Sequence, residues 1–141
     1  MDPARAIIDA NRFMTLATAG AAGVPWASPV WFAPDGERDL LWVSDPQSRH
    51  SRNLAERPEL SIVIFDSRVE PADAAGLYLS AVGAVTDEGI EVFSAHSVAQ
   101  NLPAFTRADV SGDAPLRLYR AQVKERWLLG PRSRRVALPF D

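Results

Sequence analysis

Residues 40–66, LLWVSDPQSRHSRNLAERPELSIVIFD, contain two apolar segments separated by a polar and basic one. The apolar segments DLLWVS (39–44) and ELSIVIFDS (59–67) have the length and the β-branched and aromatic composition of strands. The polar segment between them predicts a short helix, which should end before Pro58 because the residue ahead of a proline disfavours helical backbone angles. The expected order here is therefore strand, short helix, strand.

The beginning of this short helix is basic. Two N-caps are possible, either Asp45 with a proline after it or Ser48. In both cases Arg49 and His50 lie near the first turn, where free backbone N–H groups and the helix dipole already attract an anion. Ser48 would add a hydroxyl donor, and Arg49 a planar guanidinium that matches phosphate oxygens. The alternative interpretation is an ion pair between Asp45 and Arg49 or Arg52, with the remaining charges solvated.

The rest of the chain is rich in strand signals. Helices are expected over 3–12 and 87–100, and Pro29 should mark a bulge or an unpaired edge because it cannot donate to a strand ladder. Successive strands with few helices between them indicate an antiparallel barrel rather than a parallel α/β sheet. We therefore predict one mainly β domain over residues 1–141, an antiparallel barrel of six or seven strands with flanking helices. Its strands are expected at 13–19, 25–33, 39–44, 59–67, 76–87 and 116–130, with a further short one at 134–138.

Two of these strands, 25–33 and 59–67, are apolar on both faces. A small barrel buries only its inner face by itself, so the outer face would need a helix or a second subunit to cover it. Trp26, Trp31 and Trp42 fall in one region of the predicted sheet. They suit a subunit interface, a site for a flat-ring ligand, or simply the core.

Composition excludes several classes of function. The chain has no cysteine, which excludes disulfides and thiol chemistry, and its two histidines argue against a histidine-rich zinc site. We expect His96 to be a surface or hydrogen-bonded histidine rather than a catalytic acid. A net charge of -3 argues against nucleic acid or a membrane surface as a partner. Without a secretory signal or a run of about 20 apolar residues, a cytoplasmic location is expected.

The order of the segments adds a family resemblance. MTLATAGAAGVPWASPVWF followed by LLWVSDPQSRHSRNLAERPELSIVIFD resembles the pyridoxamine 5'-phosphate oxidase-like, FMN-binding split-barrel family, and LYLSAVGAVTD is similar to its central strand. The last third of the chain is similar mainly in layout. The resemblance implies a six-stranded antiparallel split barrel that forms a homodimer, with FMN in a groove to which both subunits contribute.

The resemblance also implies roles for residues around the basic helix. Ser48 and Arg49 match the family's contact to the cofactor phosphate, and Ser44 matches a Thr or Ser on the phosphate side. His50 stands where the family commonly has a lysine, and it would still donate to phosphate. Asn53, one turn further along, is expected near the phosphate or the ribityl chain.

Two other segments are assigned by the same resemblance. Trp127 and the basic residues after it are expected to reach over the flavin of a partner subunit, although Trp127 would equally fill the barrel mouth. Arg132, Arg134 and Arg135 do not match the spacing of the arginines that hold the vitamin B6 phosphate, so that vitamer is not predicted as the substrate. The residues expected along the isoalloxazine ring are Ser28, Pro29, Val30, Trp31 and Phe32.

The predicted function is an FMN-dependent oxidoreductase that transfers hydride to or from a small organic molecule. A flavin supplies the redox chemistry and the protein supplies position and electrostatics, so no catalytic side chain is assigned. No serine–histidine–aspartate arrangement stands out. A deazaflavin in the same groove is one alternative. A non-catalytic dimer that binds flavin or haem, or that has lost its cofactor, is another.

Overall fold

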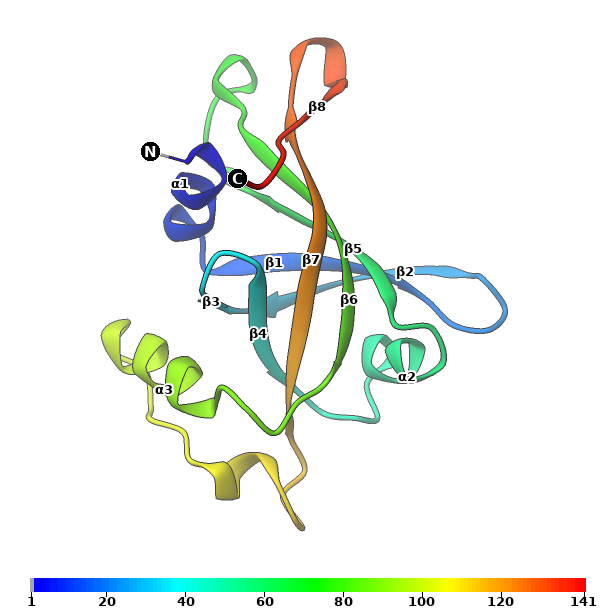
Figure 1. Ribbon diagram of the computed structural model, residues 1–141, viewed down its shortest axis with the longest axis vertical. Helices are drawn as coiled ribbons and strands as arrows, with labels where there is room; N and C mark the ends of the chain where they lie inside the picture. Colours follow the sequence, from blue (N-terminus) through cyan, green and yellow to red (C-terminus); the bar gives the residue numbers. More distant parts are fainter. Residues whose placement is uncertain (1) are drawn as a thin grey trace.

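One antiparallel sheet, curled into a half-barrel, forms the body of the molecule (Figure 1). The computed structural model describes residues 2–141, and within them eight strands are arranged in the order β2-β1-β5-β6-β7-β4-β3, with β8 beside β7. The strands are β1 (Phe13–Ala19), β2 (Pro25–Trp31), β3 (Ala33–Asp35), β4 (Asp39–Ser44), β5 (Glu59–Phe65), β6 (Gly76–Val85), β7 (Arg117–Leu129) and β8 (Arg135–Ala137).

The split-barrel architecture is therefore confirmed, with eight strands among the described residues instead of the six or seven expected. The segment 25–33 was expected to be one strand, but the structure divides it at Phe32 into β2 and β3. The two strands lie at opposite ends of the sheet order, because β2 pairs with β1 whereas β3 pairs with β4. The chain thus passes from one edge of the sheet to the other through a single residue, and this connection brings the two edges of the half-barrel together. The short strand expected at 134–138 is β8.

Pro29 lies on β2, which has a strand partner on one side only. It stands opposite Thr15 in an unbroken register, so the unpaired edge is the alternative that the structure adopts. A bulge occurs elsewhere, between Ser80 and Ala81 where β6 pairs with β7. Bulges increase local twist and bending, which suits the two longest strands of a curled sheet.

The main core fills the inside of the half-barrel. Trp42 is completely buried there and stacks on Tyr119, with 5.5 Å between ring centroids. Trp42 is thus a core residue. Helix α1 (Pro3–Ala10) lies at one end of the half-barrel and α2 (Arg49–Glu56) at the other (Figure 1). Both contribute apolar side chains to this core, among them Ala4 from α1 and Leu54 from α2.

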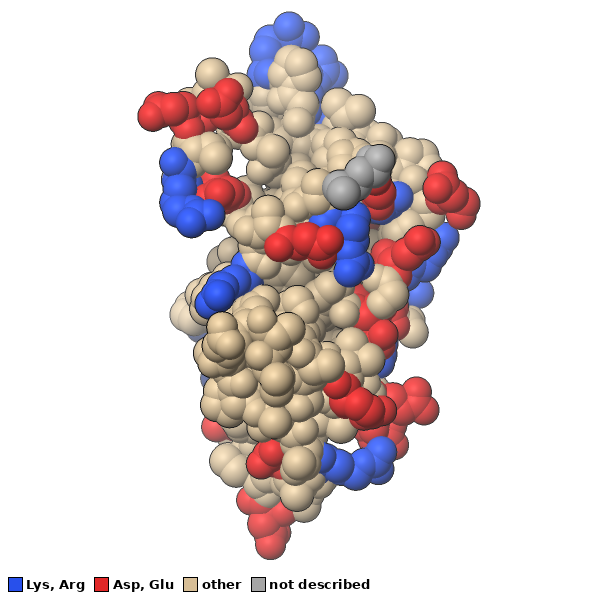
Figure 2. Space-filling view, turned by 90° about the vertical axis from the view of Figure 1, so that its left-hand side faces the viewer, with Lys and Arg blue, Asp and Glu red and all other residues tan. Residues whose placement is uncertain are grey.

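Helix α3 (Ile90–Ala99) covers part of the outer face of the sheet. Its Ile90 and Phe93 pack with Ala33, Leu41 and Leu118 of β3, β4 and β7 in a second apolar cluster. The side of the molecule on which α1 and α3 lie shows a broad area without charged side chains (Figure 2). None of the α-helices within residues 2–141 has the length and apolar character needed to cross a bilayer.

The other part of the outer face, over β2, β1, β5 and β6, has no helix on it. Phe13 on β1 is 58% exposed, and Phe65 on β5 is 53% exposed. Of the two covers expected for the outer face of the second and fourth strands, a helix is therefore not the one found over this part. Helix α3 packs on β3, β4 and β7, so an apolar surface stays open in a single chain. Its burial by a second subunit stays a prediction.

Candidate functional site

Ser48 is the N-cap of α2, which settles the choice between the two candidate caps. Its Oγ accepts a hydrogen bond from the backbone N–H of Ser51 at 3.4 Å and donates to Ser51 Oγ at 2.7 Å. Asp45 instead forms a turn ahead of the helix, where its carboxylate accepts from the N–H of Gln47. Among the described residues 2–141, no salt bridge joins Asp45 to Arg49 or Arg52. The expected alternative of a local ion pair is therefore absent.

Arg49, the first residue of α2, lies against an exposed indole. Its Cζ is 4.5 Å from the centre of the Trp26 ring, and Trp26 is 41% exposed. This is cation–π geometry, in which the ring face attracts the guanidinium and holds it beside the helix start. Trp26 was absent from the predicted site. The signal that would have found it is the β1–β2 hairpin register, which places Trp26 opposite Thr18 and next to α2.

His50 and Asn53 point inward and attach α2 to the barrel. His50 Nε2 lies 3.0 Å from Ser44 Oγ at the end of β4 and 3.3 Å from Ser48 Oγ. Burial lowers the pKa of His50, so the neutral ring is favoured at neutral pH. Asn53 donates from Nδ2 to Thr18 Oγ1 on β1, at 3.1 Å, and both side chains are buried. Contact of Ser44, His50 or Asn53 with a cofactor stays a prediction.

The β2 segment expected along the ring presents two different faces. Val30 is buried in the main core, and so is Phe32, which comes directly after β2. Ser28 is half-buried and Pro29 is exposed. Trp31 turns toward α3, where its ring packs edge-on against Phe93 at a centroid distance of 5.1 Å. Any cofactor lying along this strand would therefore meet its backbone and exposed edge rather than the core side chains.

Trp127 lies near the C-terminal end of β7, whereas the strand that leads into α2 pairs with the beginning of β7. The residue of β7 that pairs with Ser44 is Arg117, ten positions earlier, which corresponds to about 30 Å along an extended strand. Trp127 lies beside Arg135 instead. The Arg135 Cζ is 5.6 Å from the Trp127 ring and 4.7 Å from the ring of Tyr78. One chain alone does not bring Trp127 and Arg49 together. Arg132 and Arg134 are exposed beyond β7.

A shallow groove of about 510 Å³ runs over the uncovered outer face. Its walls come from β1, β5 and β6, it lies next to the β1–β2 turn, and one cation, Lys124, stands at its rim. It is open and mostly apolar, as a surface that accepts a flat ring or a second subunit should be. The lining residues are Ala17, Thr18, Ala19, Pro25, Glu59, Leu60, Ser61, Ser80, Ala81, Val82 and Lys124.

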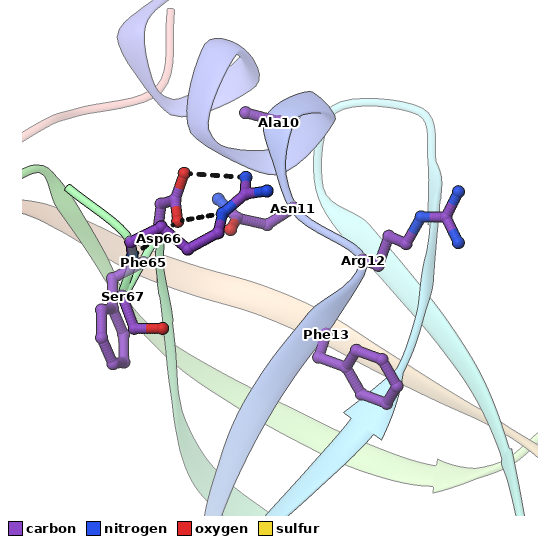
Figure 3. Close-up of a pocket in the computed structure, with 8 residues that line it drawn as sticks. Ala10, Asn11, Arg12, Phe13, Phe65, Asp66 and Ser67 are labelled. Carbon is purple, nitrogen blue, oxygen red and sulfur yellow. Dashed lines mark hydrogen bonds and ion pairs between the residues drawn. The ribbon is translucent and has the colours of Figure 1, made fainter.

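A second hollow, of about 320 Å³, lies where α1 meets β1 and where β5 ends (Figure 3). Asp66 accepts two hydrogen bonds from the Arg68 guanidinium there, at 2.9 and 3.0 Å, and the Arg68 contacts lower the pKa of Asp66 to about 2. Phe13 and Phe65 also line it. This hollow contains none of the predicted site residues, and its Asp66 and Arg68 already satisfy each other.

Comparison with known proteins gives a family match and several structural matches. The model of the family described as pyridoxamine 5'-phosphate oxidase matches residues 1–129. No curated protein sequence matches the chain. A haem-binding protein from Mycobacterium smegmatis is 24% identical with a TM-score of 0.71, over 97% of this chain and 56% of that one, so this chain spans just over half of its length.

Two further solved structures match along nearly their whole length. HutZ, the haem storage protein from Vibrio cholerae, is 19% identical with a TM-score of 0.66, over 86% of this chain and 87% of that one. A candidate pyridoxamine 5'-phosphate oxidase from Listeria innocua is 15% identical with a TM-score of 0.69, over 91% and 96%. At these identities the structures show a shared fold. From the family match over residues 1–129 together with the split-barrel architecture, the chain belongs to the pyridoxamine 5'-phosphate oxidase family.

Proposed function

We propose that this protein binds FMN as a homodimer and acts as an oxidoreductase on a small organic molecule. The observation that carries the proposal is the beginning of α2, where Arg49 lies on the exposed Trp26 ring beside the capping serine Ser48. An anionic group and a flat apolar group are both attracted to this place, and FMN has one of each.

The residues at the α2 start fit a phosphate group. The first backbone N–H groups of a helix have no partner within the helix and attract anions. Arg49 adds a guanidinium that can form two charge-assisted hydrogen bonds, and its contact with the Trp26 ring restrains its position. His50, being neutral and bonded to serine hydroxyls, contributes hydrogen bonding rather than charge. Arg49 would therefore provide most of the electrostatic attraction.

The outer groove and the far end of β7 support a shared site. The apolar groove over β1, β5 and β6 reaches Ala19 and Pro25, which flank the β1–β2 turn, and Trp26 is the next residue of β2. Trp127 lies too far from Arg49 in one chain to share a ligand with it. A second subunit packed on the uncovered face would supply Trp127 to the other subunit's ring. The same observations therefore support the proposed homodimer.

When bound, the flavin would supply the hydride-accepting ring. The residues of this chain would bind the phosphate, orient the ring along the exposed edge of β2 and exclude water through the partner. A deazaflavin would make the same phosphate contacts. Only the choice of ring in the groove would distinguish it from FMN.

Haem is the second candidate, because two of the similar solved structures are named for haem binding or storage. Arg49 and Ser48 would suit its carboxylates. The two histidines fit an iron ligand less well. His50 Nε2 is bonded to serine hydroxyls, and His96 Nε2 lies 3.0 Å from the Gln100 amide nitrogen. Since both Nε2 atoms are engaged, FMN is preferred.

The test is binding of FMN, a deazaflavin and haem to the purified chain, followed by the Arg49→Ala variant. A charge-assisted hydrogen bond contributes about 1.5–3 kcal/mol, so FMN affinity should fall roughly 10- to 100-fold in the variant. Fluorescence quenching of free FMN measures this directly.

Arg52→Ala is the matched control, since Arg52 is an exposed arginine on the same helix and, within residues 2–141, stacks on no aromatic ring. It should change FMN affinity by much less than Arg49→Ala. Equal losses would show only general charge attraction. Haem or deazaflavin binding without FMN binding would contradict the proposal and favour the corresponding alternative.

A further inference from the structure

A chain of two hydrogen bonds links β2 to the end of α3, away from the α2 start. The indole Nε1 of Trp31 donates to Oε1 of Gln100 at 3.1 Å. The amide nitrogen Nε2 of Gln100 lies 3.0 Å from Nε2 of His96. The rings of Trp31 and His96 are also in contact, with centroids 5.5 Å apart. One glutamine side chain therefore bridges two aromatic rings.

The direction of each bond is fixed by chemistry. An indole N–H only donates, so the atom of Gln100 that faces Trp31 must be the carbonyl oxygen. The NH₂ group of Gln100 then faces His96, and it too only donates. Nε2 of His96 must consequently be an acceptor. This requires a neutral imidazole that carries its proton on Nδ1.

Protonation of His96 is incompatible with this arrangement. The imidazolium carries hydrogens on both ring nitrogens, so its Nε2–H would meet the NH₂ of Gln100. If the amide rotated to offer its oxygen to His96, its NH₂ would face the N–H of Trp31 instead. One of the two bonds is lost in either case, and a half-buried donor is left without its acceptor.

We infer that Trp31, Gln100 and His96 form a pH-sensitive latch that holds the end of α3 on β2 while His96 is neutral and loosens it when His96 gains a proton. Gln100 is the positioning residue of the latch. It acts by coupling the protonation of His96 to the orientation of Trp31. The latch would operate whichever cofactor the protein binds.

The surroundings of His96 favour the neutral form. Burial is the largest influence and lowers the pKa of His96 from its ordinary 6.5. The charged groups that face it come from α1, where Asp9 raises and Arg5 lowers the pKa of His96. These two form a salt bridge of 3.1 Å, so their effects on His96 partly cancel. His96 also lies in the last turn of α3, whose C-terminal end favours a cation.

The pH dependence of the latch has a definite sign. Because the folded-state pKa of His96 is lowered, the unfolded chain binds more protons between that pKa and 6.5. The latched form is fully stabilised above pH 6.5 and is lost as the pH falls through the folded pKa. The contacts at risk are those of the Trp31 ring with Phe93 and His96 on α3.

The experiment is an NMR titration of the full chain from pH 8 to pH 5 with ¹⁵N-labelled tryptophan and histidine. The Trp31→Phe variant assigns the indole resonance. At pH 8 His96 should be the Nδ1–H tautomer. On acidification the Trp31 indole proton should shift upfield, and its midpoint should coincide with the midpoint of His96.

His96→Gln should abolish the shift of the Trp31 indole, and Gln100→Leu should uncouple it from the titration of His96. His50→Gln is the matched control, since it removes the other histidine and should leave the Trp31 response in place. An Nε2–H tautomer of His96 at pH 8, or an indole resonance that stays fixed while His96 titrates, would overturn the inference. If Gln100→Leu does not fold, the tautomer of His96 at pH 8 and the titration of the His96→Gln variant still test the inference.

Discussion

Asn53 and Thr18 form a buried polar pair between α2 and β1, with a hydrogen bond of 3.1 Å. Asn53→Ala would leave the Thr18 hydroxyl buried without this partner, and it should lower the free energy of unfolding by about 1–3 kcal/mol. Urea unfolding followed by circular dichroism measures the change. FMN affinity is not the readout, because the expected effect is on the attachment of α2.

A double-mutant cycle with Thr18→Val provides the control. Each single variant leaves one buried polar group without its hydrogen-bond partner. The double variant, Asn53→Ala with Thr18→Val, removes both polar groups. The double variant should therefore lose clearly less stability than the sum of the two single losses. Additive losses would mean that the hydrogen bond contributes nothing, and the role assigned to Asn53 would be wrong.

The beginning of α3 depends on a glycine and an arginine. Gly89 is the N-cap with φ +106°, and a Cβ placed on it would lie 2.7 Å from Nη2 of Arg120. Nη1 of Arg120 donates to Asp35 at 2.8 Å and to Asp39 at 2.7 Å, while its Nη2 donates to the carbonyl oxygen of Glu88. A side chain at position 89 would thus disturb the contacts that join α3 to β3, β4 and β7.

We expect Gly89→Ala to destabilise the protein by about 2–4 kcal/mol, the combined effect of backbone strain and a displaced Arg120. Gly112→Ala is the control, because Gly112 also has a positive φ of +58° but a Cβ added to it would meet no atom within 4 Å. It should cost only about 1–2 kcal/mol, the strain of the left-handed region alone. Thermal unfolding of both variants makes the comparison, and equal losses would contradict the role given to Arg120.

At the level of the whole molecule, the uncovered outer face is the feature that a second subunit would bury. Phe65 is 53% exposed on this face, at the opposite end of β5 from the residues that line the groove over β1, β5 and β6. If the proposed homodimer uses this surface, Phe65→Asp should convert it to a monomer, since a buried unpaired carboxylate opposes association. Light scattering coupled to gel filtration measures the mass.

Val98→Asp is the matched variant for the dimer, because Val98 is 52% exposed but lies on α3, away from that face. It should leave the dimer intact. A wild-type monomer would refute the dimer, and dissociation by Val98→Asp but not Phe65→Asp would place the interface on α3 instead.

Much of the fold could be predicted because the signals are local. Alternating apolar residues and turn residues located the strands, and Asp2 and Ser48 carried recognisable capping chemistry for α1 and α2. The division of residues 25–33 into β2 and β3 was missed. Its apolar pattern runs on without a break, and only the change of pairing partner at Phe32 separates the two strands.

The candidate site was predicted less completely. The sequence identified Ser48 and Arg49 as a place for an anion, since residue type and position in a helix suffice for that expectation. It did not identify Trp26 as the partner of Arg49, nor the inward direction of His50 and Asn53. Those depend on how α2 packs on the barrel, which is a contact between segments distant in the chain.

The sequence alone therefore established a mainly β chain, its helices and the basic beginning of α2, because hydrophobic period, caps and turns act over a few residues. Tertiary structure decided which side chains meet. The connection through Phe32 sets the position of β2. The packing of α2 and α3 then places Trp26 under Arg49 and joins Trp31 through Gln100 to His96. These contacts depend on the three-dimensional path of the whole chain, and no local pattern encodes them.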